Sequence, residues 1–181
     1  MNLSNSFKFA LWLSFFASLP VSVLPPLERK PINSEIKFKI FHYMHNAEGS
    51  SDQLSGVVRC ESNDVCNYNF TIPATSFNSK NEDRDRDMKK TIRSDEFQKI
   101  KLFGTGKLSE GKFKTQMSIQ FVGITIERPV EFNVDSGWFE KKVSGTVELK
   151  LSDFKIVLPT LLGTPIKDRL KIDISTTFKK Q

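Results

Sequence analysis

The chain has 181 residues and a formal net charge of +6 at pH 7, from 27 Lys and Arg against 21 Asp and Glu. The bases are interleaved with acids and do not form one basic block, so the charge favours solubility and argues against nucleic-acid binding. Once an N-terminal segment is set aside, the remaining length suits a single domain.

The first 22 residues have the pattern of a secretory signal peptide. Lys8 precedes an apolar run that Pro20 interrupts before it reaches the ~20 residues that a membrane span needs. We expect cleavage near Ser22, although an uncleaved anchor helix is the alternative. A proline-rich linker at residues 23–33 and one domain at residues 34–181 would follow, in a protein exported to the periplasm or secreted.

From residue 34 onward, apolar and polar side chains alternate with a period of two, which is typical of strands with one buried face. Turn residues separate the alternating stretches. The expected strands are residues 34–42, 53–60, 67–77, 99–108, 112–122, 127–134, 141–151 and 167–178. An open antiparallel meander of this length would leave two bare edges, so we expect it to close into an eight-stranded all-β barrel. Such a barrel either fills with side chains or holds one small ligand.

A short helix is predicted between the third and fourth strands. Ser79 and Asn81 can cap a helix, and Met88 and Ile92 are four residues apart, as on one helical face. The segment also carries dense alternating charge. Two interpretations of this charge stay open: a solvated helix surface, or a lid whose basic face meets an anionic head group.

Cys60 and Cys66 form an even pair of cysteines in a chain that we expect to be exported, which favours a disulfide. A hairpin between the second and third strands would bring the two residues close together. The disulfide would therefore pin one turn of the barrel.

Up-and-down connectivity divides the loops between two ends of the barrel. The short connections share one end: residues 60–66, 109–111 and 135–140. The longer connections share the other end: residues 43–52, 78–98, 123–126 and 152–166. Because function often resides on longer loops held by a rigid scaffold, we expect the head group of a ligand at the long-loop end.

A zinc site built from the cysteines with His42 and His45 is the alternative to the disulfide. It is disfavoured because His42 ends one strand at the long-loop end and Cys60 ends the next at the other, roughly 25 Å apart. The sequence also lacks the G-x-S-x-G and H-E-x-x-H motifs of hydrolases. We therefore expect no metal, no cofactor and no enzymatic activity.

Four segments, in the order of the family, resemble the YceI-like polyisoprenoid-binding proteins: SEIKFKIFHYMHNAEG, FTIPATSFNSKNEDRDRDM, VGITIERPVEF and VSGTVELKLSDFKI. The chain departs from the family in SDEFQKIKLFGTG, which lacks the second Phe and the aromatic-proline pair that are common at that place in the family, and in VGITIERPV, which is two residues longer than the family segment. The resemblance implies a lipocalin-like barrel, export, and an elongated isoprenoid chain inside the barrel, sometimes with a quinone or pyrophosphate head.

We accordingly expect an exported carrier or store for an isoprenoid lipid or quinone. Candidate tail-binding residues on the inward faces are Phe38, Ile40, Phe70, Ile72, Met117, Ile119, Phe121, Phe132, Val147 and Ile172, although each could simply pack the core. Candidate head-group residues are His42, Arg84, Asp85 and Arg93. The alternative function is an interaction or structural barrel whose charged rim contacts an envelope protein or redox partner. Transient membrane contact and a homodimer are left open.

Overall fold

The computed structural model describes residues 27–61, 63–161 and 163–179 of the protein. The elements in chain order are β1 (Leu27–Arg29), β2 (Pro31–Ile40), β3 (Ala47–Ser51), β4 (Ser55–Cys60), β5 (Val65–Pro73), η1 (Ala74–Ser76), α1 (Glu82–Thr91), β6 (Lys99–Ser109), β7 (Lys112–Phe121), β8 (Ile124–Ser136), β9 (Glu140–Leu149), η2 (Leu151–Phe154), β10 (Thr160–Leu161), β11 (Thr164–Pro165) and β12 (Leu170–Lys179). The expected signal peptide at residues 1–22 lies outside the described residues.

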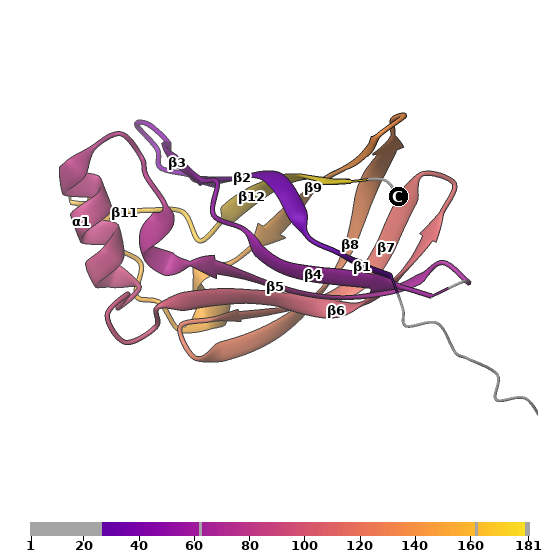
Figure 1. Ribbon diagram of the computed structural model, residues 1–181. Helices are drawn as coiled ribbons and strands as arrows, with labels where there is room; N and C mark the ends of the chain where they lie inside the picture. Colours follow the sequence, from indigo (N-terminus) through magenta and orange to yellow (C-terminus); the bar gives the residue numbers. More distant parts are fainter. Residues whose placement is uncertain (1–26, 62, 162, 180–181) are drawn as a thin grey trace, which may run out of the picture.

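The strands form a strongly curved antiparallel sheet, with α1 at one end and the turns from β6 to β7 and from β8 to β9 at the other (Figure 1). We call these the helix end and the hairpin end. The predicted all-β class, antiparallel pairing and single α-helix are confirmed. No helix in the described ranges is long and apolar enough to cross a membrane.

The main sheet has ten strands in the order β1-β4-β5-β6-β7-β8-β9-β12-β2-β3, two more than the eight expected. The additional strands are β1 and β3. In the segment that we expected to form a linker, residues 27–29 form β1 and residues 31–33 form the start of β2. The additions pair with the first and second predicted strands, β2 and β4, whose free edges would otherwise leave their backbone groups bare.

The expected pairing between the first two predicted strands is replaced by a seam. The outer edge of β2 pairs with β3, and that of β4 pairs with β1, so no backbone ladder joins β2 to β4 within the described residues. The two strands still come into contact, and Ser34 bridges the seam. Its hydroxyl donates to the carbonyl of Asp52 at 2.8 Å and accepts from the N–H of Leu54 at 3.3 Å.

Period-two alternation determines which side chains point into the curved sheet. In β7, Thr115, Met117 and Ile119 are buried, whereas Lys112 and Lys114 on the opposite face are exposed. β12 shows the same pattern, with Leu170, Ile174 and Phe178 buried. The interior is therefore built mainly from branched aliphatic and aromatic side chains.

Several boundaries differ from those predicted. The third strand ends at Pro73 and not at residue 77, because residues 74–76 form η1. The connection expected at residues 123–126 is shorter, because β8 already begins at Ile124. Val122 and Gly123 make the turn with φ of 42° and 78°, the left-handed conformation that tight hairpins use.

Helix α1 covers the helix end of the barrel. Asn81 caps its first turn, and the Asn81 side chain accepts a hydrogen bond from the N–H of Arg84 at 2.9 Å. Met88 and Ile92, the pair predicted to share a face, pack against the core. The helix thus seals this end with apolar side chains and turns its charges outward.

Candidate ligand-binding cavity

The interior of the barrel is hollow along its length, in two sections of about 110 Å³ each. The helix-end section lies beneath α1, and residues from β2, β5, β7, β9, α1 and η2 line it. The hairpin-end section lies toward the Cys60–Cys66 turn. One water needs only ~10–15 Å³, so neither section is filled by side chains.

The two sections meet at Leu102, Met117 and Ile174, which line both. They are therefore adjacent parts of the same barrel interior, with these three side chains between them. Met117 is the most adaptable of the three, because its unbranched side chain has three rotatable bonds. A narrow ligand can occupy both sections only by passing these three side chains.

The helix-end section is apolar on every side. All nineteen residues that line it have hydrocarbon, aromatic or thioether side chains, among them Phe77, Met88, Ile92 and Phe154. No hydrogen-bonding side chain of the described residues lines this space, so it can hold a ligand only through burial of apolar surface and dispersion contacts.

All ten residues predicted on the inward faces line the cavity. In the helix-end section lie Phe38, Ile40, Ile72, Ile119, Phe121, Val147 and Ile172; in the hairpin-end section lie Phe70 and Phe132; and Met117 lines both. The placement follows from strand alternation. That these residues contact a ligand stays a prediction.

The hairpin-end section also has an almost wholly apolar surface, although polar and charged residues are among those that line it. Phe113, Phe178 and other apolar residues line most of it, but Arg29, Tyr68 and Lys141 line it as well. Burial raises the pKa of the Tyr68 hydroxyl, and the hydrogen bond between Tyr68 and Thr115 lowers it in part. The Tyr68 side chain is therefore neutral in the cavity wall at ordinary pH.

Sequence reasoning missed the two cations of the cavity. Arg29 lies in the segment that we interpreted as a linker, where three prolines hide any alternation. Lys141 shares the parity of Val143 and Val147 in the predicted strand at residues 141–151, so strand alternation could have placed it on the inward face and Lys142 on the outer one.

The four predicted head-group residues do not line either section of the cavity. The Asp85 carboxylate accepts a hydrogen bond from the N–H of Ser79 at 2.9 Å and so stabilises the start of α1. Arg93 is exposed, lies over the ring of Phe97 at 4.7 Å, and pairs with Glu96. The backbone of Arg84 belongs to the helix cap.

The fourth predicted head-group residue, His42, is buried and 7% exposed. Its Nδ1 accepts a hydrogen bond from the N–H of Met44 at 3.2 Å, and its Nε2 has no partner among the described residues. The rings of Tyr43 and His45 lie next to it. No contact found among the described residues joins His42 to the arginines of α1.

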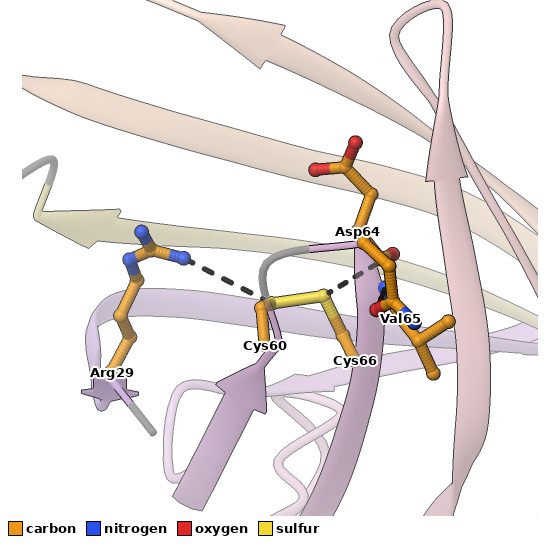
Figure 2. Close-up of a disulfide and its surroundings, with 6 residues drawn as sticks. Arg29, Cys60, Asp64, Val65 and Cys66 are labelled. Atoms are coloured by element: carbon orange, nitrogen blue, oxygen red, sulfur yellow. Dashed lines mark hydrogen bonds between the residues drawn. A yellow bond between two sulfur atoms is a disulfide. The ribbon is translucent and has the colours of Figure 1, made fainter. Parts of the chain in front are cut away.

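The expected disulfide between Cys60 and Cys66 is present at the hairpin end (Figure 2). The two residues face each other on β4 and β5, with their Cα atoms 4.0 Å apart. Within the described ranges, no group of three or more His, Cys, Asp and Glu residues is arranged to hold a metal ion.

The family model described as the YceI-like domain matches residues 28–178. A comparison with curated protein sequences finds no match.

Solved structures share the fold at low sequence identity. BcnA from Burkholderia cenocepacia has a TM-score of 0.70 at 13% identity, over 80% of this chain and 95% of that one. A polyisoprenoid-binding domain from Saccharophagus degradans, implicated in plant cell wall breakdown, has a TM-score of 0.67 at 12% identity. The match covers 87% of this chain and 100% of that one. A YceI protein of Campylobacter jejuni has a TM-score of 0.65 at 15% identity, over 96% and 99%.

Proposed function

The chain belongs to the YceI-like domain family, and on that premise we propose that it is a non-enzymatic protein that holds an isoprenoid lipid inside its barrel. The tail would be of the polyprenyl or quinone type. The observation that carries this proposal is the elongated cavity, whose helix-end section is lined by apolar residues alone. The structural relative from Saccharophagus degradans is described as polyisoprenoid-binding, which supports the same ligand class.

The physical chemistry of the cavity suits an unsaturated hydrocarbon chain. Each CH₂ group taken out of water contributes about 0.8 kcal/mol, so a few isoprene units supply substantial affinity without any polar contact. An apolar cavity offers water no hydrogen bonds, so a tail that enters it does not have to displace tightly bound water. Branched methyl groups of the isoprene units would pack against the Ile and Phe side chains of the wall.

We further propose that the protein acts outside the cytoplasm, as a carrier or store. The Cys60–Cys66 disulfide supports this, because disulfides persist in oxidising compartments such as the periplasm. A protein of this kind would shield an insoluble tail from water while the lipid is held or moved.

Extraction of the natively purified protein with organic solvent, followed by mass spectrometry, tests the proposal. We expect a co-purifying prenyl lipid, and uptake of prenyl pyrophosphate or a prenyl quinone by protein that has been stripped of lipid. An empty extract together with no uptake of either probe would contradict the proposal and favour a barrel that acts by contacting a protein partner.

A matched pair of variants connects uptake to the cavity. Val147 on β9 is buried and lines the helix-end section, whereas its neighbour Thr146 is exposed on the outer face. Val147→Phe fills the section and should lower uptake, and Thr146→Phe should leave uptake unchanged. Equal uptake by both variants would place the lipid elsewhere.

A further inference from the structure

The hairpin-end section contains an inward-facing arginine. β1 pairs with β4, and alternation turns Glu28 outward, where its carboxylate pairs with Arg59 at 2.7 Å. The next residue, Arg29, faces inward and lines the cavity. Its guanidinium lies beside the disulfide, with one nitrogen 3.9 Å from Sγ of Cys60 (Figure 2).

The hydrogen-bonding capacity of Arg29 is largely unused. A contact of 3.9 Å to sulfur is a weak one, because sulfur is a poor acceptor. The Nε atom of Arg29 is buried and has no hydrogen-bond partner among the described residues. None of the ion pairs found in these residues includes Arg29, so its positive charge lacks a carboxylate partner there.

A second cation lines the same section. Lys141 lies near the start of β9, opposite Phe178 of β12, and is partly buried. It likewise takes part in no ion pair within the described residues, whereas the neighbouring Lys142 is exposed. The described residues that line this section include no Asp and no Glu.

The buried Nε–H of Arg29, which has no acceptor among the described residues, is unfavourable by itself. Burying a charge costs free energy unless a partner of opposite charge or several hydrogen bonds compensate. An anion in the hairpin-end section would accept a hydrogen bond from the free Nε–H of Arg29. It would also supply a counter-charge to Arg29 and Lys141. The planar fork of arginine suits phosphate oxygens, and lysine adds a point charge.

We propose that Arg29 and Lys141 bind the anionic phosphate or pyrophosphate head of the lipid at the hairpin end, with the tail extending toward α1. This inference rests on the proposed function, since it assigns the orientation of the lipid in the same cavity. The helix-end section has no charged residue among those that line it and suits only the tail. The long-loop rim, where the sequence predicted the head group, turns its arginines away from the cavity.

Two probes with the same tail test the assignment: farnesyl pyrophosphate and farnesol. Wild-type protein should bind the pyrophosphate more tightly, and added salt should weaken only that binding. The Arg29→Gln/Lys141→Gln variant should lose about tenfold or more in affinity for farnesyl pyrophosphate and keep its affinity for farnesol.

The control variant is Arg59→Gln/Lys142→Gln, which removes the same charge from the same region of the sheet but on its outer face. It should retain the preference for farnesyl pyrophosphate. Arg29→Lys keeps the charge and should keep most of the preference. If the double variant does not fold, the single variant Lys141→Gln, at a partly buried position, decides the question, because it should lower the preference by itself. Inorganic pyrophosphate alone should compete only weakly, because it lacks the tail.

The outcomes separate the two proposals. If wild-type protein binds neither farnesyl probe, the proposed function fails. If farnesol binds as tightly as farnesyl pyrophosphate, or if Arg29→Gln/Lys141→Gln keeps the preference, the head-group assignment is wrong and lipid binding stands. Inorganic pyrophosphate that binds as tightly as the farnesyl ester would identify a site for a free anion.

Discussion

Tyr68 on β5 reaches across β6 to hydrogen-bond Thr115 on β7, with 3.0 Å between the two hydroxyl oxygens. The crossing is sterically allowed because Gly104 of β6 lies between them, where a Cβ would stand 2.9 Å from the Tyr68 oxygen. The Thr115 hydroxyl donates to the carbonyl of Thr105 at 2.9 Å, so Tyr68 is the donor to Thr115. One buried chain of hydrogen bonds thus joins three strands in the wall of the hairpin-end section.

Replacing Thr115 by Val should destabilise the protein by about 1–3 kcal/mol, because the buried Tyr68 hydroxyl would lose its acceptor. Urea unfolding measures the change as a lower midpoint at constant slope. Adding Tyr68→Phe to Thr115→Val should recover part of the loss, since no unpaired hydroxyl then remains. A Thr115→Val protein as stable as wild type would contradict the buried hydrogen bond.

The raised pKa of Tyr68 predicts a loss of stability in alkali. Its first cause is burial, which disfavours the phenolate, so the folded state holds the proton more tightly than the unfolded state does. This contribution is fully present below pH 10.0, the ordinary pKa of a tyrosine side chain, and is lost as the pH rises through the higher pKa of the folded state. As the pH is raised above 10.0, the free energy of unfolding should fall less steeply for Tyr68→Phe than for wild type. An identical pH dependence in both proteins would contradict the prediction.

Inward and outward faces could be predicted from the sequence because strand alternation is a local property. Once Phe38 and Ile40 share a face, the curvature of the sheet decides only that this face is the inner one. The helix cap at Asn81 and the disulfide are local as well. For these reasons the expected cavity lining agrees with the structure.

The remaining features depend on long-range pairing, which leaves little trace in a single sequence. β1 has only three residues and becomes a strand because the edge of β4 is available to it. β3, with the sequence AEGSS, has no β-branched or aromatic residue and is held by β2. Arg29 reaches the cavity only because β1 pairs with β4, so its position could not be inferred without the sheet.

Met117 should control which tail lengths the cavity accepts. Because it lies where the two sections meet, the bulkier and stiffer side chain of Met117→Phe should obstruct passage between them. Long prenyl chains should then lose affinity relative to short ones, as competition across a series of chain lengths would measure. Met117→Leu, which nearly conserves volume, is the control and should bind like wild type. Equal losses for all lengths would indicate general destabilisation and not obstruction.

The orientation of the lipid can be measured with a single tryptophan as energy donor. The chain has two, Trp12 and Trp138, and Trp138 is 92% exposed in the turn between β8 and β9 at the hairpin end. In Trp12→Phe protein, Trp138 alone reports on a prenyl pyrophosphate that carries an anthraniloyl fluorophore at the far end of its tail. Adding Trp138→Phe and Val157→Trp moves the donor to an exposed site shortly after η2, whose Phe154 lines the helix-end section.

If the head lies at Arg29 and Lys141, the fluorophore lies beneath α1. Energy transfer falls steeply with distance, so it should be stronger from the donor placed by Val157→Trp than from Trp138. Farnesol carrying the same fluorophore serves as the control, because it lacks the charged head and should show a smaller difference between the two donors. Stronger transfer from Trp138 would show the opposite orientation, with the head under the charged helix α1. Arg29 and Lys141 would then have no anionic ligand.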